Sequence, residues 1–164
     1  MSQQNRPMKI NETIEHFLKD HTVAVISTLN KKGEIHSSVK EIVGFETRGK
    51  IFIMDLYQNI TLENLKNNPT ITLTLVDEAK FKGYAFVGKA KIIIKKDIKQ
   101  SLIQGFEDKI VKRISKRLIE KVKSENSARV NFEAALPDQP KHLIEIDINR
   151  IIDLVPPKKK NDKQ

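Results

Sequence analysis

Six short runs of β-branched and aliphatic residues constrain this 164-residue chain more than any other feature of its sequence. The run Thr70–Val76 alternates apolar and polar residues almost strictly, which is typical of a half-buried β-strand. Glycine-containing turns separate the first three runs, at Asn30–Gly33 and Thr47–Gly49. The predicted strands span Thr22–Leu29, Glu34–Phe45, Lys50–Asp55, Thr70–Val76, Gly83–Lys95 and His142–Val155.

The short loops between these runs make most of the predicted strands antiparallel. Many short antiparallel strands in a small chain favour a closed barrel, so we predict a mainly β fold, a six-stranded β-barrel with added helices. One short helix stops at Asn68-Pro69, between the third and fourth strands. Apolar residues recur every four positions from Ile98, which predicts a helical insertion at about residues 97–136, broken near Gly105.

Composition excludes several classes of protein. The chain has no cysteine, and its four histidines are scattered, so a thiolate nucleophile and a zinc site are not expected. No apolar run approaches the ~20 residues of a membrane span, and no signal peptide opens the sequence. There is neither an alternating strand–helix rhythm nor a Gly-x-Gly-x-x-Gly motif for a Rossmann site. We therefore expect a cytoplasmic protein without a metal site.

The net charge of +9 is concentrated in two segments. Residues 95–123 hold ten Lys/Arg against four Asp/Glu, and the tail 158–164 holds four lysines against one aspartate. Only Phe106 is aromatic in the first segment, so no base-stacking surface is evident and a nucleic-acid partner is not expected. We predict one domain over residues 1–157, followed by a disordered Lys-rich tail.

The stretch Lys50–Pro69 is the best candidate for a binding site. It predicts a strand that ends at Asp55, a polar loop and a short helix, whose first backbone N–H groups suit a phosphate. On spacing alone, the polar side chains nearby can equally be helix caps and ordinary edge-strand residues. They are Ser37, Ser38 and Lys40 on the second strand, and Tyr57, Gln58, Asn59 and Thr61 after the third.

Three segments carry a resemblance to a known family. They are Asp55–Pro69, which contains Asp-Leu-Tyr, Glu-Asn-Leu and Asn-Pro, the strand Phe81–Ala90, and the final strand from Leu143 through Asp153-Leu154. Together they resemble the pyridoxamine 5′-phosphate oxidase-like family of FMN-binding split barrels, and most of all its subgroup of predicted flavin-nucleotide-binding proteins.

The resemblance implies a six-stranded Greek-key split barrel that forms a homodimer, with FMN between the subunits. It also implies an FMN-dependent oxidoreductase that acts on a small molecule, without specifying the substrate or any catalytic residue. Ser38 and Lys40 would line the cofactor cleft, Thr61 would donate to the phosphate, and Asn64 would steady that turn. The remaining implied cofactor-binding residues are Phe52, Ile53, Met54 and Asp55 along the isoalloxazine ring, and Tyr57 and Asn59 in the loop.

Two positions depart from the family pattern. Ile60 stands where the family usually has lysine, and Leu62 where an arginine often follows. Because a hydrogen bond to a charged group contributes about 1.5–3 kcal/mol, losing one or two such contacts would weaken cofactor binding by ~10- to 100-fold or more.

Two other functions stay open at this stage. The same barrel could bind haem or a deazaflavin, with His36 as the histidine available for haem on the candidate cleft strand. Alternatively, the chain could be a non-enzymatic binding module that uses its basic helices and Lys-rich tail.

Overall fold

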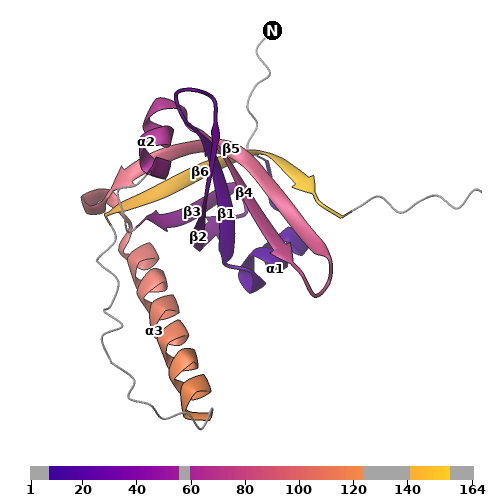
Figure 1. Cartoon of the computed structure of the whole chain (residues 1–164), viewed down its shortest axis with the longest axis vertical. Helices are drawn as coiled ribbons and strands as arrows, with labels where there is room; N and C mark the ends of the chain where they lie inside the picture. Colours follow the sequence, from indigo (N-terminus) through magenta and orange to yellow (C-terminus); the bar gives the residue numbers. More distant parts are fainter. Residues whose placement is uncertain (1–7, 56–59, 124–140, 156–164) are drawn as a thin grey trace, which may run out of the picture.

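The computed structural model describes residues 8–55, 60–123 and 141–155 of the chain. In this part of the chain, six antiparallel strands close into a barrel in the order β1-β2-β3-β6-β5-β4 (Figure 1). The elements are α1 (Glu12–Asp20), β1 (Val23–Leu29), β2 (Ile35–Glu46), β3 (Lys50–Asp55), α2 (Ile60–Asn67), β4 (Thr70–Asp77), β5 (Lys82–Ile94), a 3₁₀ turn (Lys95–Asp97), α3 (Gln100–Lys123) and β6 (His142–Asp153).

The prediction of a mainly β fold with a six-stranded antiparallel barrel is confirmed. All six predicted strands are present, and their ends differ from the prediction by at most two residues. The chain passes from β3 to β4 over one end of the barrel, because these two strands are not neighbours. This crossing places α2 at that end, where Figure 1 shows it above the barrel.

The barrel is filled by side chains that alternate along each strand. Because successive strand residues point to opposite faces, every second residue of β1, β3, β4 and β6 enters the interior. The resulting core is almost entirely aliphatic, with Phe86 as its largest fully buried side chain. Its central members are Ala24, Ile26, Ile42, Ile51, Ile53, Ile71, Leu73, Leu75, Phe86, Ile144, Ile146 and Ile148.

A second apolar cluster covers the outer face of β3. Phe52 and Met54 point out of the barrel and pack with Leu143 of β6, Val43 of β2 and Phe106 of α3. Five successive residues of β3 are therefore buried, which explains why this strand is apolar without alternation. Gly44 permits the close approach of α3, since a Cβ at this position would lie 3.0 Å from the Cδ2 of Leu102.

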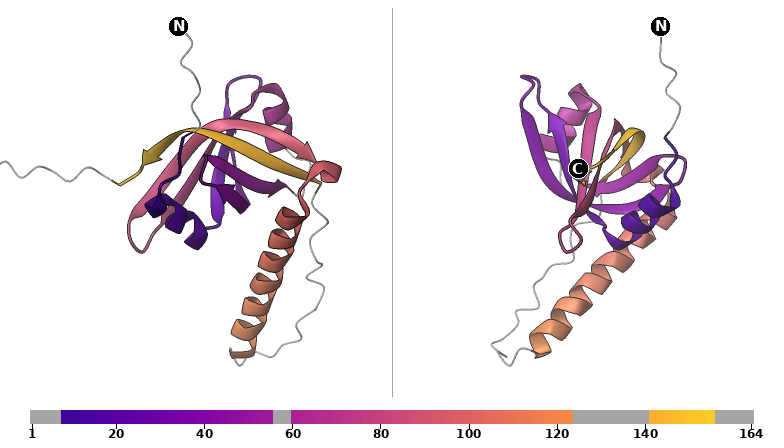
Figure 2. Two further views of the ribbon diagram at one scale, coloured as in Figure 1. Left: turned by 180° about the vertical axis from the view of Figure 1, so that it is seen from behind. Right: turned by 90° about the vertical axis from the view of Figure 1, so that its right-hand side faces the viewer.

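The predicted break near Gly105 is wrong, because α3 runs as one helix from Gln100 to Lys123. Apolar side chains on both sides of the glycine pack in the same cluster, Leu102 before it and Phe106 and Ile110 after it. This anchoring offsets the propensity cost of a glycine in a helix. Beyond the anchored part, α3 extends away from the barrel (Figure 2).

Other parts of the predicted insertion and tail are not covered by the structure. Residues 124–136 of the insertion and the Lys-rich tail lie outside the described residues. Among the helices that are described, none is both long and apolar enough to cross a membrane.

The two short helices close opposite ends of the barrel. α1 begins with Asn11, whose Oδ1 accepts a hydrogen bond from the backbone N–H of Ile14 at 2.9 Å. Ile14 and Leu18 of α1 belong to the barrel core at one end. α2 covers the other end, and its buried residues include two polar ones, Thr61 and Asn64.

Candidate functional site

The barrel interior changes from apolar to polar at the end that α2 covers. On the inner face of β1, Thr28 follows the core residue Ile26. On β2, Lys40 and Ser38 lie beyond Ile42, and on β3 Asp55 lies beyond Ile53. The period of two places these four polar side chains on the inner face. We call them, together with Thr61 and Asn64 of α2, the polar layer.

Two hydrogen bonds join α2 to the strands of the polar layer. The Oγ of Ser38 lies 3.0 Å from the Oγ1 of Thr61, and the Nδ2 of Asn64 donates to the Oγ1 of Thr28 at 3.0 Å. Thr61 sits in the first turn of α2 and is fully buried. The structure therefore brings together Ser38 and the start of α2, which are 23 residues apart in the sequence.

Lys40 and Asp55 form a buried ion pair within the polar layer. The Nζ of Lys40 donates to the Oδ1 of Asp55 at 2.6 Å, and the two side chains are 10% and 0% exposed. A carboxylate buried this deeply requires a cation or several hydrogen-bond donors to stay charged. The ammonium of Lys40 therefore compensates the charge of the Asp55 carboxylate. It is also the positive charge that lies nearest to Ser38 along β2.

Two buried polar atoms in this region have no hydrogen-bond partner in the described part of the chain. They are the Oδ2 of Asp55 and the Nδ1 of His142. Asp55 and His142 are directly paired across the β3–β6 ladder. A ligand that offers a donor to the carboxylate, or a partner to the imidazole, would satisfy groups that otherwise carry a desolvation cost.

His142 belongs to this region although no local sequence pattern indicates it. The only signal available was indirect: Asp55 ends one predicted strand and His142 begins another. Antiparallel pairing of those two strands would have placed the residues side by side, but the strand order was not known.

The candidate residues of β3 lie on opposite faces of that strand. The side chains of Phe52 and Met54 are covered by α3 on the outside, whereas Ile53 lies in the barrel core. Both edges of β3 are paired, with β2 on one side and β6 on the other. Of the four β3 candidates, Asp55 alone joins the polar layer.

The other candidates divide in a similar way. Ser37 points away from Ser38, and its Oγ lies 3.0 Å from that of Ser27 on the exposed face.

The two positions that depart from the family pattern differ in exposure: Ile60, at the first position of α2, is 54% exposed, whereas Leu62 is buried. A cation at position 60 would reach solvent near the start of α2, and one at position 62 would not. Tyr57 and Asn59 lie outside the described residues.

The polar layer offers hydroxyl groups, an ammonium and the start of a helix. Such donors suit a phosphate, and the first turn of α2 adds backbone N–H groups that have no partner within the helix. Among the described residues, no three His, Cys, Asp or Glu side chains are grouped to hold an ion. His36 lies on β2 opposite Thr28, whose Oγ1 donates to the His36 carbonyl at 3.5 Å.

A family model described as pyridoxamine 5′-phosphate oxidase matches residues 10–154. None of the curated proteins compared with the chain matches it.

Solved structures with the same fold were found at low sequence identity. HupZ of Group A Streptococcus is 17% identical with a TM-score of 0.65, and the match covers 89% of this chain and 94% of that one. A Clostridium acetobutylicum protein, described as related to general stress protein 26 and of the pyridoxinephosphate oxidase family, is 16% identical with a TM-score of 0.58 and coverages of 89% and 96%. General Stress Protein 26 from Bacillus anthracis is 18% identical with a TM-score of 0.55 and coverages of 89% and 94%.

Proposed function

Because the chain belongs to the pyridoxamine 5′-phosphate oxidase family, we propose that it is an FMN-binding flavoprotein and acts as an oxidoreductase on a small molecule. FMN, when bound, would supply the hydride or electron transfer, and the protein would bind and orient it. The observation that carries the proposal, beyond family membership, is the contact between Ser38 and Thr61 at the start of α2.

We assign the FMN phosphate to the edge of the polar layer. One hydroxyl of the Ser38–Thr61 pair donates to the other, so the remaining hydroxyl proton of the pair would donate to the phosphate, and Lys40 would add a positive charge that Asp55 partly neutralises. Asn64 would act indirectly, since its hydrogen bond to Thr28 fixes α2 against β1. The donor set of this chain thus fits a phosphate, with fewer cations than the usual family pattern supplies.

The unpartnered atoms next to this site support a ligand with a polar ring. The Oδ2 of Asp55 accepts hydrogen bonds, and the Nδ1 of His142 either donates or accepts. We assign no direct contact with the flavin to the side chains of Phe52, Ile53 and Met54. The first and third are covered by α3, and Ile53 lies in the barrel core. Tyr57 and Asn59 remain predicted contacts from the loop before α2.

We also propose that the protein is a homodimer with its cofactor near the subunit interface. The outer face of the β1–β2 hairpin exposes a group of aliphatic side chains, in which Val25 of β1 is paired with Val39 of β2. Such a patch is typical of a protein interface. It lies on the strand that also carries Ser38 and Lys40, which would bring a partner subunit close to the phosphate. A cytoplasmic location remains a prediction.

The test is to incubate the purified protein with FMN, remove free flavin by desalting and record the absorbance. We expect flavin bands that bleach with dithionite, retained at about one FMN per protomer. Ser38→Ala should lower the retained fraction. Ser101→Ala is the control, because it removes a hydroxyl from an exposed position of α3, outside the polar layer and the proposed interface, and should leave retention unchanged. Protein that stays colourless at high FMN concentration would contradict the proposal.

A further inference from the structure

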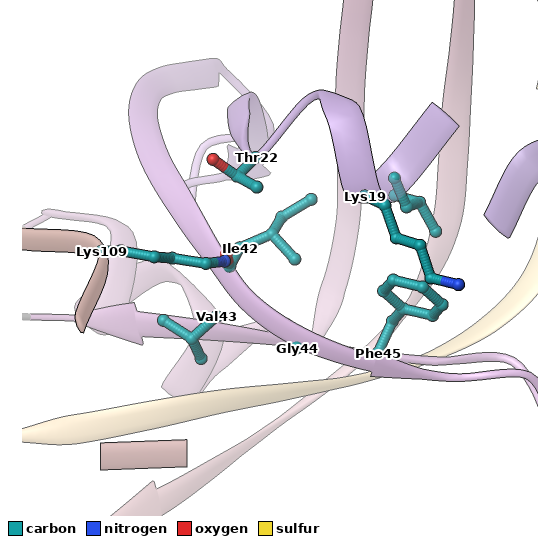
Figure 3. Close-up of a pocket in the computed structure, with 8 residues that line it drawn as sticks. Lys19, Thr22, Ile42, Val43, Gly44, Phe45 and Lys109 are labelled. Carbon is teal, nitrogen blue, oxygen red and sulfur yellow. Dashed lines mark hydrogen bonds between the residues drawn. The ribbon is translucent and has the colours of Figure 1, made fainter. Parts of the chain in front are cut away.

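A groove of about 350 Å³ lies beside β2, towards the end of the barrel that α1 closes. It is bordered by α1, by the second half of β2 and by α3. Figure 3 shows Lys109 on one side of the groove, with its ammonium next to Ile42, and Lys19 beside Phe45 on the other side. The groove shares none of its lining residues with the polar layer.

Lys109 is the chemically distinctive residue of the groove. Its half-buried ammonium donates one hydrogen bond, to the backbone carbonyl oxygen of Ile42. No carboxylate of the described residues lies within ion-pair distance of it, and the nearby Glu41 is paired with Arg113 of α3. An ammonium has three donors, so two of them have no described partner.

The surroundings of Lys109 disfavour its charged form. Burial lowers the pKa of Lys109, Glu41 opposes this effect and Arg113 adds to it. The cation is thus partly desolvated without the compensation of an ion pair, which is an unfavourable arrangement that an anion would relieve.

The other lining residues define the shape and polarity of a ligand. The side chains of Leu18, Ile42 and Val43 are buried apolar surfaces along the groove. Lys19, at the far end, is already paired with Glu15 at 2.7 Å. The groove therefore combines one cation that has no ion pair among the described residues with an apolar wall, and its volume falls at the lower end of the ~300–1,000 Å³ typical of ligand pockets.

We propose that this groove binds a small amphiphilic monocarboxylate, with its carboxylate on Lys109 and its apolar body along Val43 and Phe45 towards Leu18. Charge complementarity at Lys109 fixes the head group, and the apolar wall fixes the body. The site is separate from the proposed flavin site, and its test does not depend on flavin binding.

The test uses octanoate as the probe and isothermal titration calorimetry as the measurement. Octanoate should bind the wild-type protein, and 1-octanol should bind less tightly because it lacks the charge. Lys109→Met should weaken octanoate binding by at least ~10-fold, the loss of one charged hydrogen bond. Lys112→Met removes the same charge from an exposed position of the same helix and should change the affinity less than twofold.

Three results would overturn the proposal: no binding of octanoate at millimolar concentration, equal loss in the two lysine variants, or 1-octanol binding as tightly as octanoate. A second measurement keeps the test independent of the folding of Lys109→Met. In wild-type protein, octanoate should shift the backbone amide resonances of Thr22, Val43, Gly44 and Phe45. Shifts confined to other parts of the molecule would also contradict the proposal.

Discussion

Asp55 and Lys40 hold the polar layer together at the scale of single residues. Asp55 is fully buried, and the Nζ of Lys40 is the one cation within ion-pair distance of it among the described residues. Removal of one partner from a buried pair leaves the other charge without compensation, whereas removal of both avoids this cost. The two residues should therefore show strong energetic coupling.

Lys40→Met should lower the free energy of unfolding by about 3–5 kcal/mol. The double variant Lys40→Met/Asp55→Asn should be more stable than Lys40→Met alone, because no uncompensated carboxylate remains. Urea unfolding measures both. Lys19→Met serves as the control: it breaks the exposed pair with Glu15 and should cost less than about 1 kcal/mol. A double variant less stable than Lys40→Met would contradict this account.

Ile60→Lys should restore a phosphate contact that this chain lacks. Position 60 is exposed at the start of α2, so the change should leave stability almost unaltered while tightening FMN binding by ~10-fold or more. Flavin fluorescence titration measures the affinity. Ile60→Gln, which is polar without the charge, should give a much smaller gain. Unchanged affinity in Ile60→Lys would indicate that the phosphate does not bind at the start of α2.

For single residues, the sequence predicts which side chains of one turn lie together, but not which side chains far apart in the chain become neighbours. The turn that contains Thr61 and Asn64 was identified from adjacent residues, and its proximity to Ser38 followed from the expected strand arrangement. The proximity of His142 to Asp55 depends on the register of two strands separated by more than 80 residues, which no local pattern encodes. The roles of all these residues in binding remain predictions.

Among the elements, α3 differs most from expectation. Its apolar spacing predicted a helix, but not that its first half would cover Phe52 and Met54 on the outside of β3. A helix that packs on its own barrel and one that binds a partner show the same periodicity. Glycine is a poor helix former, so Gly105 predicts a break, but tertiary packing on both sides of it outweighs that tendency.

Gly105→Ala should raise the free energy of unfolding by about 0.5–1 kcal/mol, because alanine favours the helix and the site has room for a methyl group. A Cβ at this position would meet only the carbonyl oxygen of Val43, at 3.8 Å, which is ordinary contact distance. Thermal unfolding measures the effect. A loss of stability would indicate that α3 is not continuous at residue 105.

For the whole molecule, strand pattern and turn chemistry sufficed to predict the barrel. They did not give the order of strands around it, because the return of β6 between β3 and β5 is set by long-range pairing. The exposed face of the β1–β2 hairpin likewise becomes visible only once the inner and outer faces of the barrel are known. This face is where the proposed subunit interface can be tested.

Val39→Glu should convert the proposed dimer into a monomer. Val39 is 66% exposed on the outer face of β2, so a charge there would be buried without a partner in the dimer. Light scattering coupled to gel filtration measures the mass. The control is Val111→Glu, a similarly exposed position on α3, which should remain dimeric. A monomeric wild-type protein, or dissociation of the control but not of Val39→Glu, would contradict the assignment.

The central claim is that the start of α2 holds the phosphate of a flavin, and the most direct test compares FMN with riboflavin, which lacks that phosphate. The two affinities are measured by fluorescence titration under identical conditions. FMN should bind at least ~10-fold more tightly than riboflavin, as expected for the loss of a charged hydrogen bond. Equal affinities, or no binding of either flavin, would contradict the account.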